Sequence, residues 1–148
     1  MIFAKIDFIN LLPFHIYIKK NIHSNQLKAI IEYKKSYPSF INNKFKKRKV
    51  DSAFISSIAS RNEKNLDFGI IAKNEVLSVL LIQGIEEDDF QSQTSNALAK
   101  VLGLKGKVLI GDKALRFFHD NQNLEKYDLA KEWKNKYNLP FVFAVLCF

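Results

Sequence analysis

The segment that decides the fold is Lys107-Val108-Leu109-Ile110-Gly111-Asp112-Lys113-Ala114-Leu115. Its first four residues form an apolar run of strand length, and a glycine followed by an aspartate ends that run. Aspartate is favoured at helix N-termini, so the segment predicts a strand over 107–110 and then a helix, capped by Asp112, that contains Leu115 and Phe118. A strand that leads directly into a helix is the basic unit of α/β proteins.

Strand and helix patterns also alternate along the rest of the chain. Apolar runs with strand spacing or composition cover 2–8, 27–33, 50–55, 67–72, 76–82 and 140–146. Helices are predicted from Pro13 to Lys20, over 40–48 with Ser39 as the cap, from Ser92 or Thr94 to Leu102, and from Asp128 to Lys136, with one or two helical turns over 56–62. The polar, acidic stretch 84–91 predicts an exposed loop. This order of elements predicts an α/β fold with largely parallel sheets.

Composition indicates a globular chain with a basic surface. The 148 residues are 47% hydrophobic and include 13 Phe, which is ample for a buried core. Lys and Arg exceed Asp and Glu by 23 to 15, which gives a net charge of +8. That charge suits nucleic acid, an anionic membrane face, a small polyanionic substrate or simply a basic surface. The densest basic run, Lys44-Phe45-Lys46-Lys47-Arg48-Lys49, falls where a helix is expected to end, and cations there complement the helix dipole.

Several classes of protein are disfavoured by what the sequence contains. One cysteine, Cys147, allows no internal disulfide and offers no cluster of metal ligands. The first residues lack the features of a secretory signal, and no apolar run has the roughly 18 to 20 residues of a membrane span. The Phe residues lie in apolar strand and helix patterns rather than among basic residues, which argues against nucleic acid. We therefore expect a cytoplasmic protein that binds no metal, membrane or nucleic acid.

Five motifs carry a family resemblance. They are Asn10-Leu11-Leu12-Pro13, Asp51-Ser52-Ala53-Phe54-Ile55-Ser56-Ser57, Ile110-Gly111-Asp112-Lys113-Ala114-Leu115, Tyr127-Asp128-Leu129-Ala130-Lys131-Glu132-Trp133 and Leu139-Pro140-Phe141-Val142-Phe143-Ala144. In this order, over essentially the whole chain, they resemble the chorismate dehydratase family of the futalosine route to menaquinone. The resemblance implies a two-lobe periplasmic-binding-protein-like (type II) fold, with the ligand in the cleft between lobes.

The resemblance also implies where the lobes begin and end. Residues 1–75 would form the first lobe, to which 142–148 return, and residues 76–141 would form the second. The chain would cross between lobes near 76–79 and 139–143. Family members continue beyond the last of these motifs and commonly carry a longer insertion between Leu102 and Lys107. A C-terminally truncated form is therefore expected, and its activity stays open.

The implied reaction is loss of water from chorismate to give 3-[(1-carboxyvinyl)oxy]benzoate, driven by formation of an aromatic ring. Such a carbon–oxygen lyase needs positioning and proton transfer, and the resemblance implies no metal or other cofactor. The catalytic asparagine of the family maps onto Asn10. A neutral amide is a poor general base, so we expect Asn10 to orient the substrate, and a substrate carboxylate to take the proton. The alternative is that the Asn10 amide only closes a strand-to-helix turn.

The other candidate site residues bind the substrate. Two carboxylates call for small hydrogen-bond donors, which hydroxyls and the free N–H groups of helix starts provide. The candidates that follow strands or open helices are Ser56, Ser57, Thr94, Ser95, Gly111 and Asp112. Each serine has the alternative role of a helix cap, and so does Asp112, whose carboxylate would repel a dianion unless it accepted from a hydroxyl. Relatives commonly have Arg or Lys where this chain has Gln93, so that cation is missing.

Three other functions compete with the dehydratase. The same fold serves non-catalytic small-carboxylate binding modules. The sister enzyme 1,4-dihydroxy-6-naphthoate synthase shares the architecture, although the Ser56-Ser57 pair and the 110–115 motif favour the dehydratase. A nucleic-acid binder would use the positive charge and would lose affinity steeply with salt. We also expect a possible homodimer, because apolar surface left uncovered in a shortened first lobe favours self-association.

Overall fold

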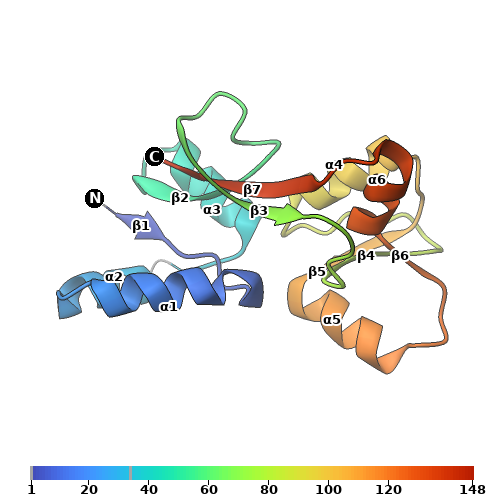
Figure 1. Ribbon diagram of the computed structural model, residues 1–148, viewed down its shortest axis with the longest axis horizontal. Coiled ribbons are helices and arrows are strands. Elements are labelled where there is room, and N and C mark those ends of the chain that lie inside the picture. The colour runs from blue at the N-terminus through green and yellow to red at the C-terminus, as the bar shows by residue number, and fades with distance from the viewer. Residues whose placement is uncertain (1, 34) are drawn as a thin grey trace. The chain divides into compact units, whose positions relative to one another are not determined.

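The computed structural model describes residues 2–33 and 35–148, which form a mixed α/β structure with two sheets (Figure 1). The strands are β1 (Phe3–Ala4), β2 (Ser52–Ser56), β3 (Asn65–Ala72), β4 (Val79–Ile82), β5 (Lys107–Ile110), β6 (Lys126–Asp128) and β7 (Phe141–Cys147). The helices are η1 (Ile9–Leu11), a 3-10 turn, and α1 (Leu12–Asn21), α2 (Asn25–Tyr33), α3 (Pro38–Lys46), α4 (Gln93–Leu102), α5 (Gly111–Asp120) and α6 (Leu129–Tyr137). The chain divides into two compact units, Met1–Ile70 with Ala144–Phe148, and Ile71–Phe143.

The first unit is built on a sheet in the order β1-β2-β7-β3. β1 pairs with β2 in parallel, with Phe3 opposite Ser52, whereas β2 and β7 are antiparallel, with Ala53 opposite Cys147 and Ser56 opposite Ala144. All five residues of β2 are buried, because α3 packs on this strand and supplies Ile41 and Phe45 to the core. The buried central strand fixes the position at which the chain leaves the sheet after Ser56.

Cys147 lies in the core of this unit and is fully buried. Burial, together with the negative charge of Glu63, raises the pKa of the Cys147 thiol to about 11. Because the thiolate is the nucleophile, the native thiol should react with iodoacetamide at pH 8 about a hundredfold more slowly than in denaturant. The raised pKa also means that the unfolded chain gives up this proton first. The stability that the buried, protonated Cys147 thiol contributes should therefore be lost as pH rises from about 9 to about 11. Equal alkylation rates in both states would contradict this burial.

The second unit contains the sheet β5-β4-β6. β4 is antiparallel to both neighbours, with Val79 opposite Ile110 and Leu80 opposite Asp128. The prediction of largely parallel sheets is therefore wrong, since β2 with β7 and β4 with both β5 and β6 are antiparallel pairs. The apolar pattern of a strand reports that it is buried and does not identify its partner or direction.

Other predicted elements differ in detail. Residues 27–33 belong to α2 and not to a strand. Leu27, Ile30 and Ile31 follow the three-and-four spacing of a helix, and the Ser24 hydroxyl accepts from the Leu27 N–H at 3.3 Å near its start. The β-branched composition was thus a weaker signal than the spacing. Residues 57–62 form turns rather than helix.

Helix starts were predicted with mixed success. Pro13 lies in the first turn of α1, and the Ser92 side chain caps α4, as predicted. The helix predicted from Asp128 begins one residue later, at Leu129, and the Asp128 side chain caps it. Ser39 and Asp112 are not the N-cap residues of their helices, because these helices begin earlier, at a proline and a glycine, respectively. The loop over 84–91 is exposed apart from the half-buried Gln91 and the buried Asp89. No described helix has the length and apolar character that crossing a membrane requires.

Candidate functional site

Three of the predicted site residues lie at one edge of the sheet in the first unit. β1 and β2 are parallel neighbours, so the chain leaves both strands at the same edge. Asn10 follows β1 in η1, with its side chain exposed, while the adjacent Leu11 is buried in the core and anchors the backbone. Ser56 is the last residue of β2, and the half-buried Ser57 follows it. Ser56 and Ser57 thus lie where β2 ends, whereas Asn10 lies further along the chain from the end of β1.

The Ser56 side chain is held by a residue on α3. Asn42 Nδ2 donates to Ser56 Oγ at 2.8 Å, and the Ser56 N–H donates to Asn42 Oδ1 at 3.1 Å. Both residues are buried, with exposures of 3% for Ser56 and 2% for Asn42. The Ser56 carbonyl accepts from the N–H groups of Ala59 at 2.8 Å and Ser60 at 3.0 Å. Ser56 is thus fixed in a tight turn and caps no helix.

Two predicted residues open α4 in the second unit. Ser92 is the N-cap, and its Oγ accepts from the Ser95 N–H at 3.1 Å. The Ser92 hydroxyl also donates to Ser95 Oγ at 2.9 Å. Thr94 and Ser95 are both buried. The capping role therefore belongs to Ser92, which leaves the cap interpretation of Ser95 without support.

The remaining two predicted residues open α5. Gly111 has a φ of 59°, in the left-handed region that favours glycine, and its N–H donates to the Ser78 carbonyl at 2.9 Å. The residue is buried where β5 ends, and its N–H is already engaged by this bond. Asp112 is exposed in the first turn, where a negative charge complements the helix dipole.

An ion pair links these two helix starts, and sequence reasoning missed both of its residues. The Asp89 side chain is 1% exposed, and its Oδ2 lies 2.6 Å from Lys113 Nζ in the first turn of α5. Asp89 Oδ1 accepts from the Gln91 N–H at 3.0 Å, and the Asp89 N–H donates to Asn96 Oδ1 of α4 at 2.9 Å. Asp89 is thereby bonded to both helices.

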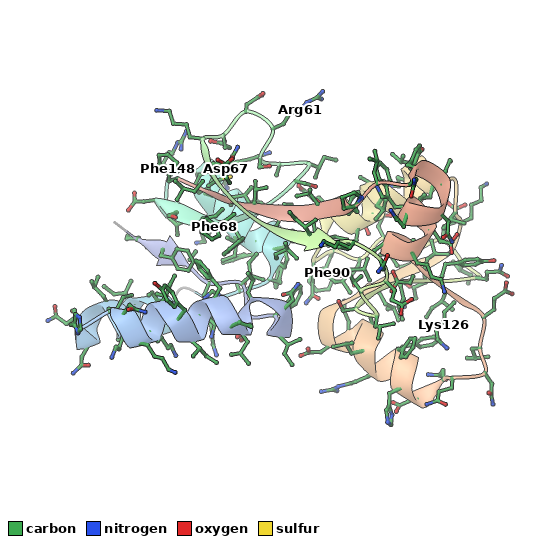
Figure 2. The ribbon with its side chains drawn as sticks, viewed as in Figure 1. Arg61, Asp67, Phe68, Phe90, Lys126 and Phe148 are labelled. Atoms are coloured by element: carbon green, nitrogen blue, oxygen red, sulfur yellow. The ribbon has the colours of Figure 1, made fainter. Side chains whose placement is uncertain are left out.

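Lys113 places a cation beside the start of α4. Its Nζ also lies 5.3 Å from the centre of the exposed Phe90 ring, which is labelled in Figure 2. Lys113 belongs to the 110–115 motif, yet nothing in its sequence context signals an ion pair. The burial of the Asp89 carboxylate could not be predicted either, because every residue of an acidic loop is expected to be exposed.

A hollow of about 220 Å³ lies elsewhere in the second unit. Its wall includes Glu86, Glu87 and Asp88, which pair with Lys105 at 3.6 Å, Lys107 at 2.7 Å and Lys100 at 2.8 Å, respectively. None of the predicted site residues lines it. Because these three lysines are balanced by the three carboxylates, the pairs give the hollow no net positive charge that would attract an anionic ligand. Among the described residues, no group of three or more His, Cys, Asp or Glu side chains is arranged to hold a metal ion.

Comparison with known proteins gives two matches. A family model described as menaquinone biosynthesis matches residues 92–148. The chain is also 53% identical over 148 aligned positions to the chorismate dehydratase of Campylobacter jejuni subsp. jejuni serotype O:23/36 (strain 81-176), in an alignment that covers 97% of this chain. The chain spans 66% of the length of that relative.

Proposed function

We propose that this chain, which belongs to the chorismate dehydratase family of menaquinone biosynthesis, removes water from chorismate to give 3-[(1-carboxyvinyl)oxy]benzoate. The observation that carries the proposal is the 53% identity, spread over 97% of the chain, to a protein with that activity. The reaction breaks a ring C–H bond and the C–O bond to the hydroxyl. The proton and the hydroxide leave as water, and the ring becomes aromatic.

Asn10 is the proposed catalytic residue. Its exposed side chain stands at the sheet edge, and its amide can donate through the NH₂ group and accept through the oxygen. The buried Leu11 beside it limits backbone movement, which suits a group whose task is orientation. Because an amide does not take a proton at neutral pH, a carboxylate of the substrate is the proposed proton acceptor.

Most of the proposed substrate-binding residues offer neutral hydrogen-bonding groups. They are the hydroxyls of Ser56, Ser57, Thr94 and Ser95, the backbone at Gly111, and Asp112 as an acceptor for a substrate hydroxyl. Lys113 adds a positive charge, which Asp89 holds in place.

The periplasmic-binding-protein-like fold is part of the proposal. Its support is the division of the chain into two units, the second of which interrupts the first. The homodimer stays a prediction as well. β3 lies at the edge of its sheet, and its Leu66, Phe68 and Ile71 side chains are exposed, with Phe68 labelled in Figure 2.

The proposal is tested by incubating the protein with chorismate at neutral pH, without added cofactor, and separating the products by chromatography. We expect the enolpyruvyl-benzoate to accumulate with time and with protein concentration. Calorimetry with chorismate runs in parallel. Binding without turnover would favour a carboxylate-binding module of the same family. The absence of both binding and turnover would refute the proposed function of this chain.

A further inference from the structure

We infer that Asn42 sets the direction of the hydrogen bond at Ser56, so that the Ser56 hydroxyl is held as a donor for a carboxylate of the ligand. Asn42 is then a positioning residue, acting through Ser56. The inference rests on the proposed function, because it takes the ligand at this sheet edge to be the dicarboxylate chorismate.

The orientation of the Asn42 amide follows from its partner. A backbone N–H can only donate, and the Ser56 N–H lies 3.1 Å from one end of the Asn42 amide. That end must therefore be the oxygen, and the other end must be the NH₂ group, which can only donate. The NH₂ group lies 2.8 Å from Ser56 Oγ, so the serine oxygen is the acceptor in this bond.

A serine hydroxyl that accepts from Asn42 still has its own hydrogen to donate. Within residues 2–33 and 35–148, Asn42 is the residue whose side chain hydrogen-bonds Ser56 Oγ, so that hydrogen has no acceptor there. Ser56 is 3% exposed, and leaving a buried donor unpaired costs free energy. Such a group is expected where a ligand completes the pairing.

The position of Ser56 fits this role. It is the last residue of β2, and exposure rises at once along the chain, through the half-buried Ser57 to Ile58 at 52%. A carboxylate seated on this turn would therefore meet the hydroxyl at the surface of the sheet edge. A hydrogen bond from a neutral donor to a carboxylate is among the stronger kinds, so its loss should be measurable.

Asn42→Asp is the discriminating substitution, because it keeps the shape of the side chain and reverses the polarity of one bond. The carboxylate still accepts from the Ser56 N–H, but its second oxygen accepts from the Ser56 hydroxyl and takes the hydrogen meant for the ligand. At pH 8 we expect the chorismate concentration for half-saturation to rise about tenfold to a hundredfold, with kcat changed less. The half-saturating chorismate concentration is measured from initial rates or, for a chain that binds without turnover, from calorimetry.

Asn43→Asp is the matched control. Asn43 is the next residue of α3 and is exposed, so this variant adds the same charge without touching Ser56. We expect its half-saturation to stay within about twofold of the unmodified protein, as is usual for surface changes.

Lowering the pH gives a rescue that loss of packing would not show. Burial raises the pKa of an introduced carboxyl, and once protonated this group donates to Ser56 Oγ as the amide does. The N42D defect should therefore shrink from pH 8 to pH 5. In an S56A background, N42D should have little further effect, because the hydroxyl it captures is absent. An N42D defect that persists at pH 5, or in the S56A background, would overturn the inference in favour of simple charge repulsion.

The two proposals fail in different ways. Unmodified protein that neither binds nor converts chorismate refutes the proposed function. If the unmodified protein binds or converts chorismate and N42D behaves identically at pH 8, the role of Asn42 is refuted. Where N42D does not fold by circular dichroism, S56A decides, and unchanged half-saturation in S56A overturns the inference.

Discussion

Asp128→Ala is expected to lower the free energy of unfolding by about 3 to 5 kcal/mol, because one carboxylate serves four backbone donors. Oδ1 accepts from the N–H groups of Ala130 at 3.0 Å and Lys131 at 3.1 Å, which caps α6. Oδ2 accepts from those of Val76 at 2.9 Å and Leu77 at 2.7 Å, which lie before β4. Asp128 is 8% exposed, so water replaces these bonds poorly.

The segment before β4 depends on this carboxylate for a further reason. Leu77 has a φ of 55°, a conformation that a branched apolar residue adopts only when its surroundings enforce it. Without Oδ2 the segment loses the bonds that enforce it. The substitution should therefore loosen the start of β4 together with the start of α6, although these lie far apart in the sequence.

Urea denaturation followed by circular dichroism measures this effect. Asp128→Asn should be intermediate, because an amide retains one acceptor oxygen and turns an NH₂ group toward N–H donors. Asp120→Ala is the control, since this exposed aspartate at the end of α5 pairs with the neighbouring His119, whose side chain is also exposed. It should stay within about 0.5 kcal/mol of the unmodified protein. An equally small change for Asp128→Ala would contradict the four-bond arrangement.

Asn10→Ala is expected to lower the proposed chorismate turnover by about a hundredfold to a thousandfold. The amide orients the substrate, and small losses of alignment are costly when positioning is most of the catalysis. Because the side chain is exposed, the free energy of unfolding should change by less than about 0.5 kcal/mol. Activity and stability should therefore separate clearly in this variant.

Initial rates over a range of chorismate concentrations check the prediction. Asn43→Ala is the matched control, because it deletes another exposed asparagine of the same unit, on α3, that is not a predicted site residue. Asn10→Asp keeps the size but removes the donor, so its rate reports whether donation matters. Turnover in Asn10→Ala within a few-fold of the unmodified protein would remove Asn10 from the catalytic role.

Local signals in the sequence predicted much of the fold. The 107–110 strand, the Ser92 cap and the helix that follows Asp128 depend on neighbouring residues, and the structure confirms all three. The prediction of strand direction failed because β2 pairs with β7. The residues of neither strand indicate a partner so distant in the sequence. The strand predicted over 27–33 is a helix, because the three-and-four spacing of its apolar residues outweighs their β-branched composition.

The candidate site divides in a similar way. Residues at strand ends and helix starts could be nominated from the sequence, and their roles stay predictions. Asn42 could not be nominated, because it sits mid-helix like any polar residue of a solvated face, and its burial comes only from the packing of α3 on β2. Asp89 was hidden for the same reason, since a distant lysine decides its environment.

The pairing of β2 with β7 has a consequence for how the protein emerges from the ribosome. The second unit is continuous in sequence, begins after β2 and ends within β7, and its own sheet lies entirely between these two strands in the chain. It can therefore complete its own sheet while the first unit still waits for β7. Until β7 is synthesised, the buried strand β2 has an unpaired edge, which makes the nascent first unit the aggregation-prone part and a natural client for chaperones.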